Sequence, residues 1–331
     1  MDTHTLGTTG PDVSALGLGL MGMSDLYGPT SEAESIATIH AALDAGITLL
    51  DTGDWYGMGA NELLLRDALK SRNRDNAVIS VKSGILRDPS GAVLGIETRP
   101  ASIKNFLAHT LRRLGTDHVD IYRMSRLSPE VPIEDVVGTL AELVQAGHVR
   151  HIGLSEVGAD SLRRAAAVHP ISDLQIEYSL ISRGIEDEIL PTARELGIGV
   201  TAYGVLSRGL ISGHWAKEKA GQADFRSHLP RFSGENLDQN LALVEELRRI
   251  ADAKDATVAQ VAIAWVLSRG ADIVPLVGAR RRDRLAEALG ALEVTLTDDD
   301  LAVIEAAVPA DAVAGTRYDA SQMSILDSER R

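Results

Sequence analysis

Short apolar runs alternate along the chain with longer segments in which apolar residues recur at helical spacing. The short runs are rich in Val, Ile and Leu, residue types that favour β-strands. Eight of them are predicted to be strands: Leu16–Leu20, Ile47–Asp51, Ala77–Lys82, Val119–Met124, Arg150–Ser155, Asp173–Tyr178, Ile198–Tyr203 and Asp272–Val277.

Helices are predicted between most of these strands. The first, Ser31–Ala45, opens with Ser31 and Glu34 at capping-box spacing and ends at Gly46, a residue type common after helices. The others are Asn61–Lys70, Ser102–Leu114, Ile133–Ala146, Ala159–Val168, Ile185–Leu196, Asn236–Asp252, Val258–Ser268 and Arg281–Leu289. This alternation of strand and helix indicates parallel strands joined by right-handed crossovers.

Eight strand–helix units predict an α/β fold, a single (β/α)8 TIM barrel that occupies residues 1–312. A short N-terminal hairpin is expected at Leu6–Val13, and one extra C-terminal helix is expected from Asp298 to about Val308. Residues 204–234 form an insertion long enough to be functional, and residues 313–331 are expected to be a mobile tail.

Composition and charge narrow the classes of function. The 331-residue chain has no cysteine, which excludes disulfides, cysteine-ligated zinc and a thiol nucleophile. Its 33 Lys+Arg against 47 Asp+Glu give a net charge of −14, so we expect no binding to nucleic acid or to an anionic membrane. Without a signal-like N-terminus or an apolar run of membrane-spanning length, a cytoplasmic location is expected. No histidine pattern predicts a metal site, and the oligomeric state is left open.

Gly17, Gly19 and Gly22 have the spacing of the dinucleotide-binding glycine loop. In a Rossmann unit, however, these glycines follow a strand and lead directly into a helix. Here the glycines begin inside the predicted strand, and the helix starts only near Ser31. We therefore interpret them as small residues at places where neighbouring backbone passes close by.

Acidic, phenolic and ammonium groups follow adjacent predicted strands. Asp51 ends the second strand, Tyr56 lies just beyond it, and Lys82 ends the third. The carboxyl ends of barrel strands form the active-site face, so the three side chains should meet there. An ammonium group beside a phenol stabilises the phenolate and favours its action as a general acid, and a carboxylate keeps that ammonium charged.

The motifs around these residues resemble those of the aldo-keto reductase superfamily. The resemblance runs in collinear order from about Leu6 to Leu292. It is carried by Asp51-Thr-x-x-x-Tyr56-Gly57, Val81-Lys82-Ser83, Val119-Asp-Ile-Tyr122, Gly153-Leu-Ser155, Gln175-Ile-Glu-Tyr-Ser179 and Ala202-Tyr203-Gly-Val-Leu206-Ser-Arg-Gly209.

The resemblance implies a barrel that binds NADP(H) in extended form, without a Rossmann domain, and reduces a small carbonyl substrate to an alcohol. Tyr56 would donate the proton, Lys82 would tune it and Asp51 would hold Lys82. Tyr203 would stack on the nicotinamide, while Ser155 and Gln175 would bind its carboxamide. The implied cofactor residues are Gly22, Met23, Asp51, Ser155, Gln175, Tyr203, Gly204, Leu206, Arg208, Gly278, Arg280, Arg284 and Glu287.

Four arginines lie at residues 280–284, where the last strand leads into a helix. Positive charge at a helix N-terminus is unfavourable unless an anion binds there. Arg280 and Arg284 share a helical face and would form a fork suited to phosphate. In the resembled family the matching segment grips the 2′-phosphate of adenosine, which favours NADP(H) over NAD(H), and Glu287 matches a position that contacts adenine. A solvated basic surface is the alternative interpretation.

Ser125 marks a departure from the family pattern. Most members place a histidine after the fourth strand, whereas the aligned segment here is Met124-Ser125-Arg126. A serine hydroxyl can also donate a hydrogen bond to a carbonyl oxygen, so Ser125 is the fourth candidate catalytic residue. The serine also supports a second hypothesis, in which the barrel binds NADPH and responds to redox state but turns substrate over weakly.

Arg123 has the same strand parity as Ser125, so it should point into the barrel and pair with a carboxylate. A bulge that turns it outward is the alternative. A different alternative concerns the activity itself, since Glu156 and Glu177 at two strand ends could be the carboxylate pair of a hydrolase. That interpretation leaves Tyr56 and Lys82 without a role.

Overall fold

The computed structural model describes residues 1–24, 26–215 and 225–330. Eight parallel strands close a barrel in the spatial order β3-β4-β5-β8-β9-β10-β11-β12, with β12 paired to β3. Their bounds are β3 Gly17–Gly19, β4 Leu49–Gly53, β5 Val78–Ser83, β8 Val119–Met124, β9 Val149–Ser155, β10 Asp173–Glu177, β11 Gly199–Tyr203 and β12 Ile273–Val277. Each lies within two residues of its predicted position at both ends, so the predicted barrel is confirmed.

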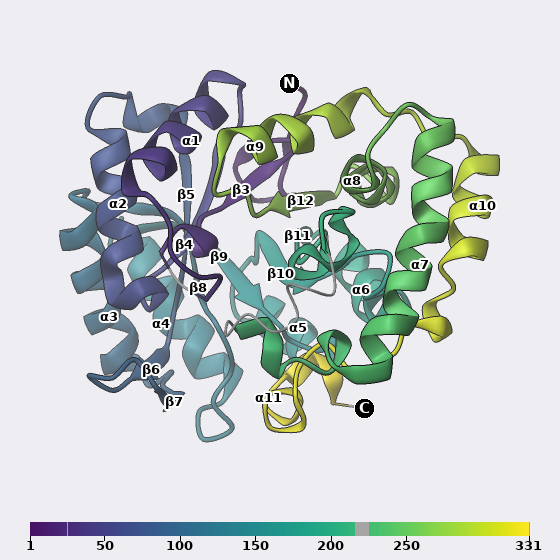
Figure 1. Ribbon diagram of the computed structural model, residues 1–331. Coiled ribbons are helices and arrows are strands. Elements are labelled where there is room, and N and C mark those ends of the chain that lie inside the picture. The colour runs from purple at the N-terminus through teal and green to yellow at the C-terminus, as the bar shows by residue number, and fades with distance from the viewer. Residues whose placement is uncertain (25, 216–224, 331) are drawn as a thin grey trace.

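Helices surround the barrel on its outer side (Figure 1). Their bounds are α1 Glu32–Asp44, α2 Ala60–Leu69, α3 Pro100–Leu114, α4 Ile133–Gln145, α5 Ala159–Ala166, α6 Ile189–Glu195, α7 Gly234–Ala253, α8 Val258–Ser268, α9 Arg282–Leu289 and α10 Asp298–Ala307. The extra helix after residue 298 is therefore present. The main core lies between this ring of helices and the outer face of the strands. Within the described part of the chain, no helix is both long enough and apolar enough to cross a membrane.

The cap of α1 differs in one detail from its sequence prediction. The Ser31 side chain accepts a hydrogen bond from the Glu34 backbone N–H at 3.4 Å, as expected for an N-cap. The Glu34 carboxylate does not complete the box, because it binds the Arg282 guanidinium across the first and last units of the barrel. Glu34 thus forms an ion pair with Arg282 instead of completing the helix cap, and this pair helps to join the first and last units of the barrel.

The N-terminal hairpin covers the end of the barrel where the strands begin. Strand β1 (Thr3–Thr5) pairs antiparallel with β2 (Asp12–Ser14). Leu6 and Val13 are buried against Leu49, Ile121 and Val274, which belong to three barrel strands. This apolar plug keeps water away from the bottom of the barrel interior.

Gly17 and Gly19 form β3, between β12 and β4. A Cβ on Gly17 would lie 2.9 Å from Leu49 Cδ2 and 3.0 Å from Leu276 Cδ1. Helix α1 begins only at Glu32. Gly17 is therefore needed for strand packing, and the rejection of a Rossmann loop is supported.

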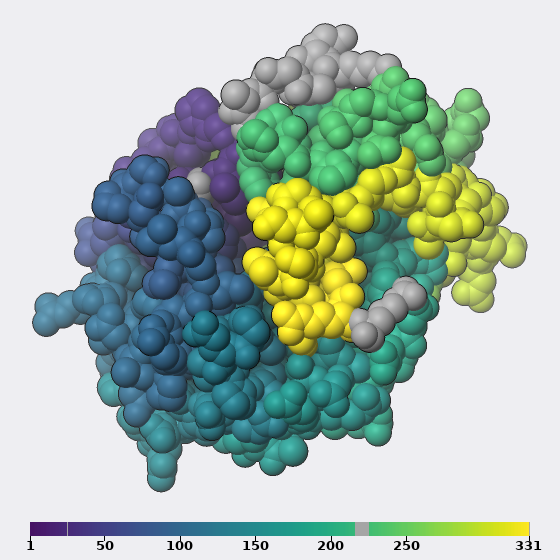
Figure 2. Space-filling model, turned by 90° about the horizontal axis from the view of Figure 1, so that it is seen from below, coloured from purple at the N-terminus to yellow at the C-terminus, as the bar shows by residue number. Residues whose placement is uncertain are grey.

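Two segments extend over the carboxyl ends of the strands. A hairpin of β6 (Ile85–Arg87) and β7 (Val93–Ile96) follows β5 and was not predicted. Residues 313–330, expected to form a mobile tail, instead contain α11 (Ala320–Ser324) and pack across this end of the molecule (Figure 2). Leu326 is 1% exposed and Arg317 is 8% exposed. These contacts are those of a segment docked on the barrel. The mobility of the tail and the domain boundary at residue 312 remain predictions.

The hairpin plug predicts a difference between two glycines with similar backbone angles. Gly7 has φ +65° and a Cβ there would lie 2.6 Å from Ser172 O, whereas Gly147 has φ +80° and open space around the added atom. Gly147→Ala should lower the free energy of unfolding by about 1–2 kcal/mol, from backbone strain alone. Gly7→Ala should lose about 1–3 kcal/mol more, from overpacking. Urea denaturation measures both, and equal losses would show that the hairpin does not pack tightly.

Candidate active site

Asp51 and Lys82 lie inside the barrel on neighbouring strands. Lys82 Nζ donates a hydrogen bond to Asp51 Oδ1. Asp51 Oδ2 accepts from Ser80 Oγ at 2.8 Å and from Gln175 Nε2 at 2.8 Å. Asp51 is 2% exposed and Lys82 is 5% exposed. Two charged residues can be buried this deeply only because they pair with each other.

Tyr56 begins the turn that follows β4 and is 4% exposed. Its ring centroid lies 5.2 Å from Lys82 Nζ, and the Trp55 ring packs edge-on at 4.5 Å between centroids. Within the described residues its hydroxyl makes no hydrogen bond, which leaves it available to a substrate. Burial, and secondarily the Asp51 charge, raise the pKa of Tyr56 well above its usual value, so the phenol keeps its proton. The expected lowering of this pKa by Lys82 is thus not seen in the cofactor-free protein.

The Lys82 ammonium loses its proton more easily than that of an ordinary lysine. Burial lowers the pKa of Lys82 to about 8, against the opposing attraction of Asp51, and the Arg123 charge lowers it further. Lys82 therefore carries its charge at neutral pH and begins to lose it in mildly alkaline solution.

Ser125 follows β8 and is buried beside Trp55. The Trp55 indole Nε1–H donates a hydrogen bond to Ser125 Oγ at 3.0 Å. Because this contact uses a lone pair of the serine, the hydroxyl hydrogen stays free to be donated. Ser125 and Trp55 line the same cavity as Tyr56.

Arg123 points into the barrel, as its strand parity predicts, and is 0% exposed. Its Nη2 donates to both oxygens of Asp173 at 2.9 Å. Its Nη1 lies 3.5 Å from Asp51 Oδ2. The outward alternative is therefore wrong, and the guanidinium lies beside the candidate catalytic group.

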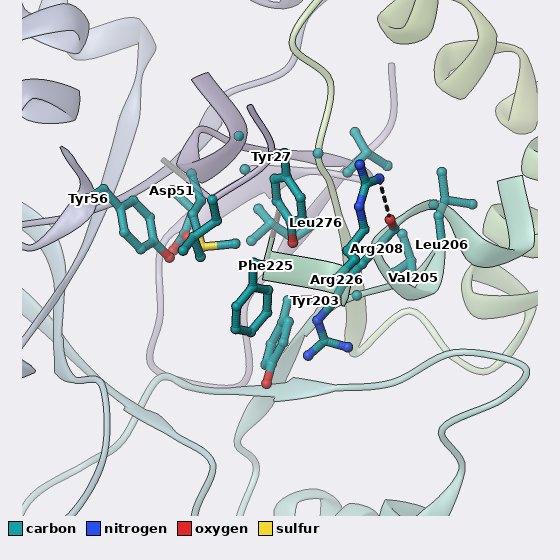
Figure 3. Close-up of a pocket in the computed structure, with 18 of the residues that line it drawn as sticks. Tyr27, Asp51, Tyr56, Tyr203, Val205, Leu206, Arg208, Phe225, Arg226 and Leu276 are labelled. Carbon is teal, nitrogen blue, oxygen red and sulfur yellow. Dashed lines mark hydrogen bonds between the residues drawn. The ribbon is translucent and has the colours of Figure 1, made fainter. Parts of the chain in front are cut away.

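A cavity of about 470 Å³ opens at the carboxyl ends of the strands and is lined by all four candidate catalytic residues. In Figure 3 the rings of Tyr27, Phe225 and Tyr203 lie between the Asp51–Tyr56 end and the Arg208–Leu206 end. The cofactor candidates that line it are Gly22, Asp51, Ser155, Gln175, Tyr203, Gly204, Leu206, Arg208, Gly278, Arg280, Arg284 and Glu287.

Met23 is the exception among the candidates. Its side chain is 3% exposed and belongs to the hydrophobic core. The short 3-10 helix Met21–Met23 turns Met21 and Gly22 toward the cavity and Met23 away from it. Met23 therefore does not line the cavity as expected, and Met21 lines it instead.

The arginine cluster divides into two pairs. Arg281 binds Asp283 and Arg282 binds Glu34, and neither lines the cavity. Arg280 and Arg284 do line it, and Arg284 Nη1 donates to Glu287 Oε2 at 2.9 Å. Two guanidinium groups in the lining of one cavity thus suit a phosphate.

Several cavity residues were missed by sequence reasoning. Tyr27, Phe225, Arg226 and Tyr318 come from loops and from the tail, where no periodicity gives a side chain's direction. Arg226 lies over the Tyr27 ring, with 5.4 Å between the guanidinium carbon and the ring centroid. The insertion after β11 therefore reaches the loop after β3 across the cavity.

Glu156 and Glu177 are held as anions by arginines. Arg317 donates to Glu156 through Nη1 and Nη2, and Arg208 Nη2 donates to Glu177 Oε2 at 2.9 Å. Burial alone would raise the pKa of both carboxyls, but the adjacent guanidinium groups hold each pKa below its usual value. Neither can serve as the protonated acid of a hydrolase, so that alternative is not supported. Among the described residues no His, Asp or Glu cluster could hold a metal.

The cavity has the donor set that a nicotinamide dinucleotide requires. The two guanidinium groups suit its phosphates, the Tyr203 ring suits a planar heterocycle, and Ser155 with Gln175 suits an amide. A Cβ on Gly278 would meet no atom within 4 Å, so the wall there is open to a ligand. A Cβ on Gly22 would lie 3.2 Å from Arg280 Cγ, which explains the glycine beside the arginine.

Known proteins share this sequence and this barrel. The model of the aldo/keto reductase family matches residues 15–309. A soybean (Glycine max) protein named probable aldo-keto reductase 1 is 43% identical over 315 residues, which cover 95% of this chain and 90% of the relative.

Solved structures of other proteins have a similar fold. A glycerol dehydrogenase from Gluconobacter oxydans superimposes with a TM-score of 0.84 at 29% identity, over 93% of this chain and 96% of that one. An aldo-keto reductase from Bacillus halodurans, in its holo form, gives 0.78 at 28% identity, over 94% and 97%. The chain therefore belongs to the aldo/keto reductase family, whose members are oxidoreductases that act on carbonyl and alcohol groups, generally with a nicotinamide cofactor.

Proposed function

We propose that this enzyme reduces an aldehyde or ketone to the alcohol with NADPH, and that Tyr56 donates the proton. The observation that carries the proposal is the shared cavity, whose lining includes the trio of Asp51, Tyr56 and Lys82 together with Arg280 and Arg284. A cavity lined by both groups suits a long cofactor whose reactive ring reaches the trio while its phosphates meet the arginines.

Each residue of the trio has a separate role. NADPH, when bound, supplies the hydride that attacks the carbonyl carbon. Negative charge then develops on the carbonyl oxygen, and the Tyr56 hydroxyl gives its proton to that oxygen. The Lys82 ammonium, 5.2 Å from the tyrosine ring centroid, stabilises the phenolate that remains. Asp51 keeps the ammonium charged and in place.

Ser125 supplies a second donor to the carbonyl oxygen. Trp55 occupies one lone pair of the serine and thereby orients its hydroxyl. A serine is shorter than the histidine of most relatives, so the substrate must approach more closely or share a water molecule. The hypothesis of a weakly active binding protein is not favoured, because the trio is complete and the relatives are named as reductases and a dehydrogenase.

Preference for NADPH over NADH rests on Arg280 and Arg284. Both guanidinium groups line the cavity, and a 2′-phosphate would give them a dianion to bind. Arg280 Nη1 donates to Tyr27 O at 2.7 Å, which fixes its direction before any ligand arrives. Glu287, bound to Arg284, would lie beside the adenine.

Removing the Tyr56 hydroxyl tests the proton-donor role. Tyr56→Phe should lower kcat for carbonyl reduction by roughly 10²- to 10⁴-fold, the usual contribution of a general acid. NADPH affinity should change by less than about twofold, because the hydroxyl makes no hydrogen bond within the described structure. Tyr178→Phe is the matched control, since that buried hydroxyl binds Glu186 outside the cavity. Wild-type turnover in Tyr56→Phe would remove the assignment.

Arg284→Ala tests the phosphate end. The dissociation constant for NADPH should rise roughly 10- to 100-fold, since a hydrogen bond between charged groups contributes about 1.5–3 kcal/mol. NADH affinity should hardly change, as measured by quenching of tryptophan fluorescence. Arg281→Ala removes an equal charge that is paired with Asp283 outside the cavity, and should alter neither affinity. An equal loss for both cofactors would reject the 2′-phosphate role.

The pH dependence of reduction should follow Lys82. The pKa of Lys82 is lowered to about 8, and only the protonated ammonium stabilises the Tyr56 phenolate. As the pH rises through about 8, kcat/KM for the carbonyl should therefore fall, and below that pH it should level off. A profile measured from pH 6 to 10 that stays flat would mean that Lys82 keeps its proton or is not needed.

A further inference from the structure

Arg123 is a fully buried cation that the proposed chemistry does not use. It is 0% exposed, and it lies on β8 opposite Lys82 of β5. A buried cation is costly unless anions and hydrogen-bond acceptors surround it. The acceptors that surround Arg123 therefore indicate its role.

Asp173 on β10 is its main partner. Arg123 Nη2 donates to both carboxylate oxygens at 2.9 Å, and Thr201 Oγ1 on β11 donates to Asp173 Oδ2 at 2.6 Å. Arg123 Nε and Nη1 have no hydrogen-bond acceptor among the described residues, and Nη1 lies 3.5 Å from Asp51 Oδ2. The guanidinium is thus held from one side by Asp173 and presents its other side to Asp51.

Gly153 provides the space for this pair. It lies on β9, between the strands that carry Arg123 and Asp173, and is in register with Asp173. A Cβ at this position would lie 2.4 Å from Asp173 Oδ1 and 2.7 Å from Arg123 Nε. Three adjacent strands therefore combine to seat the guanidinium beside Asp51.

Asp51 consequently faces two cations. Lys82 Nζ donates to one of its oxygens, and the Arg123 guanidinium lies 3.5 Å from the other. In a buried site, where charges are weakly screened, the second cation offsets part of the attraction between Asp51 and the Lys82 proton.

We propose that Arg123, anchored by Asp173, is a positioning residue that shares Asp51 with Lys82 and so makes Lys82 a stronger acid. The inference rests on the proposed function, in which Lys82 acts on the Tyr56 phenolate. A more acidic ammonium is a stronger hydrogen-bond donor to that phenolate. Such a gain matters most in a site where Ser125 replaces a histidine donor.

Among the described ionisable groups around Lys82, no group other than Arg123 lowers the Lys82 pKa by its positive charge. The ionisable groups that face it are Asp51 from β4, Tyr56 after β4, Arg123 from β8 and Asp173 from β10. Strands β3 and β12 carry no ionisable residue. Of this set, only Arg123 adds positive charge.

The test is the Lys82 pKa in cofactor-free protein, measured by NMR. The chain has six lysines, so protein labelled with ¹⁵N-lysine gives few side-chain signals, and Lys82→Arg identifies the one needed. Arg123→Met should raise the Lys82 pKa by about one unit or more, the usual effect of a neighbouring charge. Asp173→Asn should lower it, because the Asp173 charge no longer favours the ammonium and because Arg123 is then left with Asp51 as its remaining carboxylate. The double variant should fall between the two.

Opposite shifts from two members of one pair separate the proposal from a structural role, which would shift both variants in the same direction or neither. If Arg123→Met fails to fold because Asp173 is left unpaired, Asp173→Asn and the double variant decide, and the proposal requires the lower pKa in Asp173→Asn. Arg74→Met is the control, since Arg74 pairs with Asp120 near the start of β5 and should leave Lys82 unchanged.

Activity gives a second reading. The alkaline limb of kcat/KM should move to higher pH in Arg123→Met and to lower pH in Asp173→Asn. An unchanged Lys82 pKa in both variants overturns this inference even if carbonyl reduction is found. Absence of any carbonyl reduction would overturn the proposed function and leave the NMR result to stand for itself.

Discussion

The burial of charge at the centre of the barrel determines how the rest of the site is built. Asp51 and Lys82 are almost inaccessible to water, and each is tolerated there because the other is present. Arg123 beside Asp51 in turn requires Asp173, and Asp173 takes the Thr201 hydroxyl. Strands β4, β5, β8, β10 and β11 are therefore joined by one chain of polar contacts. The position of Lys82 is thereby fixed by the barrel, while Tyr56 approaches it from a turn.

Most of the barrel could be predicted from the sequence because its strands are buried on both faces and stand out as short apolar runs. The errors lie where local pattern and packing differ. A helix was expected from Ile185, but Gly184–Glu186 forms a separate 3-10 turn and α6 begins only at Ile189. The β6–β7 hairpin was missed because its two strands are three and four residues long. The trio of Asp51, Tyr56 and Lys82 was found because strand ends of a barrel converge whatever the loops do.

The tail could not be predicted, because its docking depends on contacts between residues far apart in the chain. Arg317 binds Glu156, 161 residues away, and Tyr318 Oη lies 3.0 Å from Tyr203 Oη. Nothing local to Arg317 selects Glu156 from the 47 acidic residues of the chain. Glu156 is buried and Arg317 supplies most of its counter-charge, so each of the two charges makes the burial of the other possible. The charge that made Glu156 resemble a hydrolase residue is therefore what holds the tail over the cavity.

Strand β8 shows how one short segment can alter the site at two depths. Successive side chains of a strand point to opposite faces, so Arg123 and Ser125 both face the interior, one layer apart. Ser125 lies at the cavity, where its hydroxyl is oriented by Trp55. Arg123 does not line the cavity and meets Asp51 instead. In the proposed mechanism, a change at residue 125 would therefore act on the carbonyl oxygen directly, whereas Arg123 would reach the reaction only through Asp51 and Lys82. Positions 123 and 125 lie on the same face of the same strand. The Ser125 hydroxyl at the cavity and the Arg123 cation one layer deeper therefore both belong to the surroundings of the candidate trio.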